Sequence, residues 1–157
     1  MEYLLSDPPG DDPVKTTHTA QYHAVVEHEA GWTVRVPAFD IARRGSSLAE
    51  AWQKAEDALD EAILSRLIEQ TRIPEPARPG DECLIAPSLR AQVALLLRTA
   101  RGDRTLLDLQ SLLRASWDRV TSMLEGRKDL KINSLDKIAR QLGGRMSITF
   151  EIPDDSK

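Results

Sequence analysis

Five apolar positions at fixed spacing constrain the C-terminal part of this chain more than any other sequence feature. They are Leu109, Leu113, Ala115, Val120 and Met123. Two short helices that meet at a steep angle need apolar side chains inside the elbow and a brief turn between them. The spacing therefore predicts a helix-turn-helix pair, in which the second helix would read DNA.

Residues that start and stop helices surround this pair. Ser88, Thr105 and Ser116 each stand where a side chain can cap a helix, and Gly143 and Gly144 follow the last expected helix. We expect helices over residues 88–101, 106–113, 116–125 and 134–142. The first of them is expected to turn inward Leu89, Val93, Leu96, Leu97 and Ala100.

The second helix of the pair and its flanks hold the candidate DNA contacts. Outward positions near its start are expected to reach base edges in the major groove, while nearby basic side chains contact phosphates. The predicted DNA-binding residues are Arg114, Ser116, Trp117, Arg119, Thr121, Ser122, Arg127 and Lys128. Trp117 either contacts DNA or packs on the turn, and both interpretations stay open.

Four positions depart from what such a pair usually contains. Gln110 stands where a small residue is usual, and Arg114 stands where the turn usually has glycine. Asp118 and Glu125 would lie near phosphates and weaken affinity. We therefore expect modest DNA affinity per subunit, and a plain four-helix bundle that binds nothing stays the alternative interpretation.

After Gly144, apolar and polar residues alternate over residues 146–152, which predicts a β-strand with one apolar face. No partner strand stands nearby in the sequence. Because an exposed apolar strand edge invites association, we expect this strand to pair with its twin across a two-fold axis in a homodimer. The predicted dimerisation residues are Met146, Ile148, Phe150 and Ile152.

The N-terminal half shows strand periodicity followed by helical periodicity. Two alternating runs around Tyr22 and Val34 flank a turn at Gly31, which predicts an antiparallel hairpin, with a weakly marked third strand over residues 40–44. Ser47 and Glu50 form the pattern of a capping box ahead of a helix of about 20 residues. A proline-rich linker and a possible strand over residues 82–86 follow. The fold class expected is α+β, one helix over a small antiparallel sheet, followed by an all-α domain.

Charge divides the chain at the same place as the patterns do. Residues 1–88 hold 8 Lys and Arg against 16 Asp and Glu, a formal net charge of −8, whereas residues 89–152 hold 12 against 7, a net charge of +5. A basic half suits nucleic acid, and an acidic half suits a basic protein partner. The alternative is that both are ordinary solvated surfaces.

The sequence offers no catalytic set, so we expect a protein that is not an enzyme. A two-metal nuclease needs clustered carboxylates, and the first strands supply only Glu27 and Glu29 near a turn. No Cys/His cluster predicts a metal site, and no motif predicts a cofactor. Cys83, the single cysteine, is expected to be a small buried hydrophobe. No apolar run reaches the ~20 residues that a membrane span needs, so we expect no membrane partner. Because a single cysteine permits no intrachain disulfide, we expect a cytoplasmic protein.

Both halves resemble one known family. Residues 22–63, YHAVVEHEAGWTVRVPAFDIARRGSSLAEAWQKAEDALDEAI, resemble the partial RNase H-like domain of HicB-type antitoxins. Residues 105–152, TLLDLQSLLRASWDRVTSMLEGRKDLKINSLDKIARQLGGRMSITFEI, resemble the Xre-like helix-turn-helix of longer members of that family. The order of the two domains is more specific than either motif alone.

The resemblance implies an antitoxin that binds a small basic HicA-type toxin, an mRNA-cleaving protein, and represses its own operon by binding operator DNA. The proline- and aspartate-rich composition of residues 1–19 predicts a flexible arm that the family pattern lacks. The remaining chain is expected to form a toxin-binding domain (20–87), a DNA-binding and dimerisation domain (88–152) and a tail (153–157). Acidic and aromatic positions of the first domain are the toxin-binding candidates: Glu27, Glu29, Trp32, Glu56 and Asp60. The alternative is a stand-alone dimeric regulator whose N-terminal domain senses a ligand or is structural.

Overall fold

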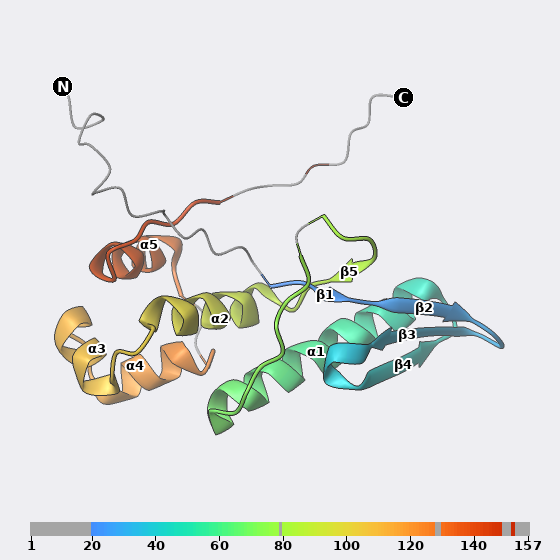
Figure 1. Cartoon of the computed structure of the whole chain (residues 1–157), viewed down its shortest axis with the longest axis horizontal. Helices are drawn as coiled ribbons and strands as arrows, with labels where there is room; N and C mark the ends of the chain where they lie inside the picture. The colour runs from blue at the N-terminus through green and yellow to red at the C-terminus, as the bar shows by residue number, and fades with distance from the viewer. Residues whose placement is uncertain (1–19, 79, 128–129, 149–151, 153–157) are drawn as a thin grey trace.

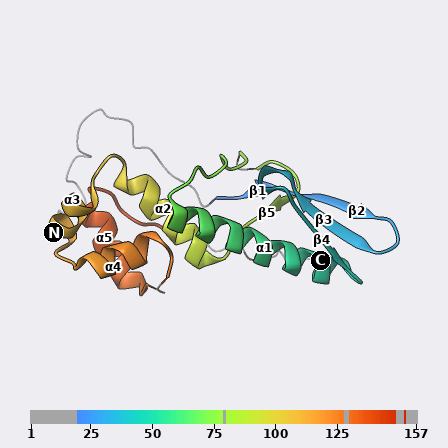
Figure 2. The ribbon, with the colours of Figure 1, turned by 90° about the horizontal axis from the view of Figure 1, so that it is seen from below.

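A sheet packed on one long helix occupies one end of the molecule, and a group of shorter helices occupies the other (Figure 1). The computed structural model describes residues 20–78, 80–127, 130–148 and 152. The same division is visible from below, where the sheet lies along the far end of the long helix (Figure 2). This arrangement confirms the predicted α+β class, with small antiparallel sheets and five α-helices in the described residues.

Three antiparallel strands form the main sheet in the order β2-β3-β4. They are β2 (Val25–His28), β3 (Trp32–Val36) and β4 (Ile41–Gly45). The hairpin register pairs Val26 with Val34, as the alternation of apolar residues requires. The third strand therefore exists, one residue later than predicted, because the 3-10 turn η2 (Pro37–Phe39) and a left-handed Asp40 come first.

A second, two-stranded sheet joins β1 (Tyr22–His23) to β5 (Leu84–Ile85). The Ala24 N–H extends the pairing by donating to the Cys83 carbonyl over 2.9 Å. The predicted fourth strand is thus real but only two residues long. Cys83 lies outside it, with φ +48 and an exposed side chain, so the expectation of a buried cysteine is wrong.

The helix α1 (Leu48–Glu69) covers one face of the sheet. The Ser47 hydroxyl accepts the Glu50 N–H over 3.1 Å, as predicted. The Glu50 carboxylate reaches back one residue further than the predicted capping box requires, to the N–H of Ser46 over 2.9 Å and to its hydroxyl. In a full capping box the Glu50 carboxylate would accept the N–H of Ser47, whereas here it accepts the N–H of Ser46.

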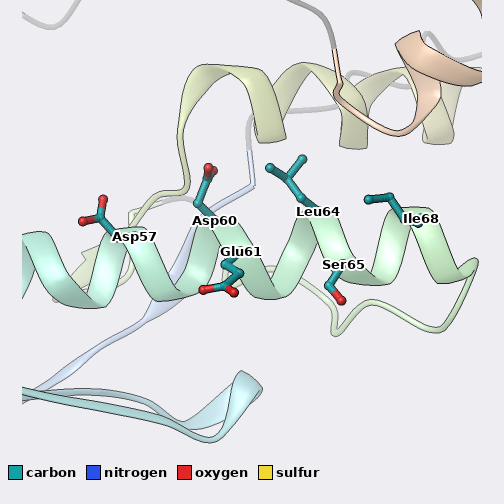
Figure 3. A pocket seen from close by; sticks show the side chains of 6 residues that line it. All are labelled: Asp57, Asp60, Glu61, Leu64, Ser65 and Ile68. Atoms are coloured by element: carbon teal, nitrogen blue, oxygen red, sulfur yellow. The ribbon is translucent and has the colours of Figure 1, made fainter.

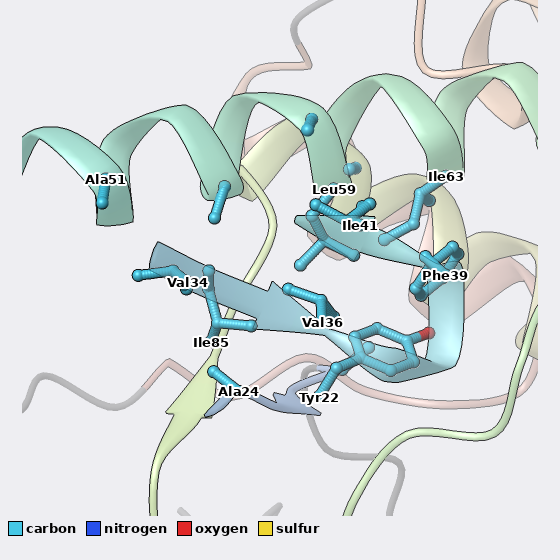
Figure 4. Close-up of a cluster of buried hydrophobic side chains, with 14 of the residues drawn as sticks. Tyr22, Ala24, Val34, Val36, Phe39, Ile41, Ala51, Leu59, Ile63 and Ile85 are labelled. Carbon is cyan, nitrogen blue, oxygen red and sulfur yellow. The ribbon is translucent and has the colours of Figure 1, made fainter. Parts of the chain in front are cut away.

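The buried residues of α1 that face the sheet include three alanines, which let the helix approach the strands closely. The first hydrophobic core lies between α1 and the sheet (Figure 4). A Cβ at Gly45 would lie 2.6 Å from the Ala51 nitrogen, so the end of β4 has no room for a side chain. Burial raises the pKa of Tyr22 to about 12, and its hydroxyl donates to the Pro74 carbonyl over 3.2 Å. The first core contains Tyr22, Val34, Val36, Leu59, Ile63 and Ile85, among others.

Four helices make up the rest of the described chain: α2 (Leu89–Arg101), α3 (Leu106–Leu113), α4 (Trp117–Leu124) and α5 (Ile132–Gln141). Leu97, Met123 and Ile138 form their core, with half-buried leucines around them. The bounds of α3 agree with those predicted. In contrast, α5 begins at Ile132, two residues before the predicted start, with no side-chain cap.

One helix, α2, contributes to both cores. Ala91 and Ala94 belong to the core of the sheet and α1, whereas Leu97 belongs to the core of the helical half. The predicted inward face is therefore partly wrong, since Leu89 is 77% exposed and Ala100 is exposed as well. Ala91 and Ala94, with the partly buried Leu95 beside them, are the side chains of α2 that pack in the core of the sheet and α1.

The predicted terminal strand is not formed in the described residues. Residues 145–148 and 152 have no regular secondary structure, and Phe150 lies outside the described residues. Met146 is half-buried, Ile148 is exposed and Ile152 is 83% exposed. A single chain provides no twin for the strand to pair with, so pairing across a dimer stays a prediction.

Candidate nucleic-acid interface and acidic groove

The connection between α3 and α4 is short because Arg114 takes a left-handed conformation. Its φ of 49° and ψ of 47° turn the chain at the end of α3, and the Ala115 N–H donates to the Gln110 carbonyl over 3.2 Å. Ser116 then caps α4 by accepting the Arg119 N–H over 3.3 Å. Three residues, 114–116, thus link the two helices. Arg114 occupies the position in this turn where glycine is usual.

The apolar positions that predict this pair lie between α3, α4 and their neighbours. Leu109, Val120 and Met123 are buried, while Leu113 and Ala115 are half-buried. Gln110 is also half-buried, so it is accommodated at the edge of the contact rather than in the core. Three of the five predicted apolar positions are therefore buried and two are half-buried, while the helix-turn-helix assignment stays a prediction.

The start of α4 presents basic and aromatic side chains to solvent. Arg114, Ser116 and Arg119 are exposed, and Trp117 is 51% exposed. Half of the Trp117 surface therefore stays available for contact even though the ring also touches the protein. Asp118 is exposed on the same turn and places one negative charge among these cations.

The remaining predicted DNA contacts are less accessible. Thr121 and Ser122 are half-buried, and the Thr121 hydroxyl is buried without a hydrogen-bond partner among the described residues. In this conformation the Thr121 hydroxyl faces inward, not toward a groove of DNA. Arg127 is exposed but pairs with Glu125 at 2.6 Å between Nε and Oε2. Lys128 lies outside the described residues.

The toxin-binding candidates fall on the hairpin and on α1. On the hairpin, Glu27 pairs with Arg35 at 3.2 Å, Glu29 is exposed in the turn, and Trp32 stacks on the His28 ring with 3.9 Å between ring centroids.

On α1, Glu56 accepts the Trp52 indole N–H over 3.0 Å, and Asp60 accepts the backbone N–H of Ser88 over 3.0 Å. Sequence reasoning could not foresee that Asp60 positions the start of α2, because the two residues are 28 apart in the chain.

A shallow groove runs along the side of α1 next to α2 (Figure 3). Its volume is about 480 Å³. Its lining residues come from successive turns of α1: Asp57, Asp60, Glu61, Leu64, Ser65 and Ile68. The helical periodicity predicts the acidic face of α1 from the sequence. The fold shows in addition that Leu64 and Ile68 lie in line with these acids and complete the lining of the groove.

Within the described ranges, no group of three or more His, Cys, Asp and Glu residues is placed to hold a metal ion. The carboxylates of Glu27 and Glu29 have no third acidic neighbour on the sheet that would complete such a set. Across the same residues, none of the helices is long and apolar enough to cross a membrane.

The fold and these surfaces define a two-part protein, in which an acidic sheet-and-helix half shares one helix with a basic helical half. The chain is similar to Antitoxin HicB 1 of Photorhabdus laumondii subsp. laumondii, at 26% identity over 125 residues. The match covers 78% of this chain and 81% of that protein. It confirms the resemblance to HicB-type antitoxins that the sequence motifs indicate. No family model matches the chain.

Proposed function

We propose that this protein is the antitoxin of a type II toxin–antitoxin pair and that it acts by binding rather than by catalysis. The observation that carries the proposal is the similarity to Antitoxin HicB 1, which covers 78% of the chain. In this proposal the N-terminal half neutralises a small basic HicA-type toxin, an mRNA-cleaving protein. The net charge of −8 on residues 1–88 supports capture of a basic partner, because complementary charge speeds encounter and selects the partner.

The second part of the proposal is that the helical half binds the operator of its own gene. Exposed Arg114, Trp117 and Arg119 at the start of α4 support this assignment, as does the net charge of +5 on residues 89–152. In a helix-turn-helix protein, side chains at the start of the second helix contact base edges. The Arg127 and Lys128 positions would add phosphate contacts.

We further propose a homodimer or higher homo-oligomer, formed through Met146, Ile148, Phe150 and Ile152. The exposure of Ile148 and Ile152 in the single chain supports an apolar surface that awaits a partner. Deleting residues 145–157 should convert the dimer to a monomer by light scattering. An unchanged mass would contradict this part of the proposal.

The neighbouring gene provides the test of the whole proposal. Its product, expressed alone in a bacterial host, should arrest growth, and co-expression of this chain should restore growth and yield a co-purifying complex. Operator binding is tested with the DNA upstream of the pair in a gel-shift experiment, against unrelated DNA of equal length. A neighbouring product that neither arrests growth nor binds this chain would favour a stand-alone regulator instead.

A further inference from the structure

We infer that the groove on α1, lined by Asp57, Asp60, Glu61, Leu64, Ser65 and Ile68, is the surface that receives the toxin. The inference rests on the proposed function and goes further by naming the docking surface and the chemistry of its occupant. That occupant is a positively charged protein surface that carries at least one protruding apolar side chain.

Among the described residues, no cationic side chain forms an ion pair with the carboxylates of this groove. Glu61 has no ion pair or side-chain hydrogen bond among the described residues, and Asp57 accepts only the Gln53 amide, over 3.0 Å. Two acids elsewhere in the sheet-and-helix half do have cationic partners: Glu50 pairs with Lys54 and Glu27 with Arg35. The groove therefore keeps a negative charge that a cationic partner can satisfy.

Apolar surface lies beside these carboxylates. Ile68 is 44% exposed at the last turns of α1, and Leu64 is half-buried one turn earlier. Figure 3 shows Leu64 and Ile68 on the side of α1 that faces α2, along the line that Asp60 begins. The carboxylates lie toward the start of the groove and the apolar side chains toward its end, and protein-binding patches likewise combine apolar contact surface with charged residues.

The groove is formed before any partner arrives. At one end Asp60 holds the backbone of Ser88, and further along Gly126 approaches so closely that a Cβ there would lie 2.6 Å from Leu64 Cδ2. Ala91 and Ala94 fix α2 against the first core. A preorganised surface loses little conformational entropy on binding, which favours affinity.

The hairpin offers less to a basic partner. Glu27 is already paired with Arg35, and Glu29 is a single carboxylate in the turn. Next to this turn, the Trp32 ring is stacked on His28. We therefore assign the toxin to the α1 groove and treat the hairpin as the competing location in the experiment.

The experiment measures the affinity of the full chain for the purified product of the neighbouring gene by titration calorimetry at low and high salt. Glu61→Lys should weaken binding by about tenfold or more at low salt and by less at high salt, because screening reduces the repulsion. Ile68→Ser should weaken binding at both salt concentrations. Glu75→Lys, the same charge reversal at an exposed linker position outside the groove, should stay within about twofold of the wild type.

Each other outcome has a separate meaning. Wild-type affinity in both Glu61→Lys and Ile68→Ser overturns the groove, and so does a loss seen in Glu29→Lys instead. A wild-type chain that does not bind the neighbouring product contradicts the proposed function itself. If Glu61→Lys lowers the oligomer mass but not toxin affinity, a second copy occupies the groove and the inference is wrong. Asp57→Lys replaces Glu61→Lys should the latter melt below the wild type by circular dichroism.

Discussion

At the scale of single residues, the most informative position is Arg114. A left-handed conformation costs a residue with a Cβ about 1–2 kcal/mol, and glycine avoids most of that cost. The chain nevertheless places arginine there, with φ 49°. The sequence pattern marks this position as unusual, and the structure shows the conformation in which the arginine is held. A cationic side chain at the turn can contact a DNA phosphate, which glycine cannot do.

Arg114→Gly should therefore separate stability from DNA binding. We expect the variant to gain about 0.5–1 kcal/mol in free energy of unfolding, measured by urea denaturation, because the backbone strain at the turn is relieved. The same variant should bind operator DNA more weakly, with a salt dependence flatter by roughly one counterion. Arg119→Ala is the control, since it should lose the same binding without the gain in stability. An Arg114→Gly variant that is less stable than the wild type would contradict the strain argument.

At the scale of the elements, capping residues predict well where helices begin. Tertiary packing instead decides which face of a helix is buried and which short strands form. Ser88, Thr105 and Ser116 each accept the backbone N–H three residues later, and α2, α3 and α4 begin directly after them. The inward face of α2 was not predictable, because it depends on how closely α1 approaches. For the same reason the short β5 and the exposed Cys83 depend on a tertiary pairing with Tyr22 and Ala24.

The start of α1 provides a pH-dependent test. The bonds to Glu50 from Lys54 and Ser46 lower the pKa of its carboxyl from 4.5 to about 2. Because the pKa of Glu50 is lower in the folded than in the unfolded state, its ionised carboxylate stabilises the fold at pH values above the unfolded pKa. This stabilisation is lost as the pH falls from about 4.5 toward 2 and the carboxylate becomes protonated. Glu50→Gln should lower the melting temperature at pH 7, and the gap should close across that window.

Glu29→Gln is the control for this measurement. It removes an exposed carboxylate that makes no ion pair or side-chain hydrogen bond within the described residues, so its melting temperature should follow the wild type across the same pH range. A constant gap between Glu50→Gln and the wild type down to pH 2 would show that the carboxylate does not act through its charge.

At the scale of the whole molecule, two halves of opposite charge are joined by contacts as well as by the chain. The division of charge and the order of strands and helices are readable from the sequence, because they follow from local composition and periodicity. The contacts between the halves are not. Gly126 meets Leu64 of α1 and Ala94 of α2, and nothing in the local pattern distinguishes it from the other helix-ending glycines.

Two glycine substitutions isolate this contact. Both Gly126 and Gly143 have positive φ, but a Cβ at Gly126 meets Leu64 at 2.6 Å, whereas one at Gly143 has nothing within 4 Å. Gly143→Ala should cost about 1 kcal/mol in free energy of unfolding from the backbone alone. Gly126→Ala should cost roughly 1 kcal/mol more, because Leu64 must also shift. Equal losses in urea denaturation would show that the approach of the two halves at Gly126 contributes little.

The position of α2 in both cores has a practical consequence for dividing the chain into separately produced pieces. A fragment that stops after residue 87 leaves uncovered the apolar surface of α1 against which Ala91 and Ala94 pack. A fragment that starts at residue 88 carries the complementary surface bare. A fragment that ends after Arg101 covers that surface but bares Leu97, which belongs to the core of the helical half. To resist aggregation, this fragment therefore needs a polar substitute at Leu97, and a helical piece needs polar substitutes at Ala91 and Ala94.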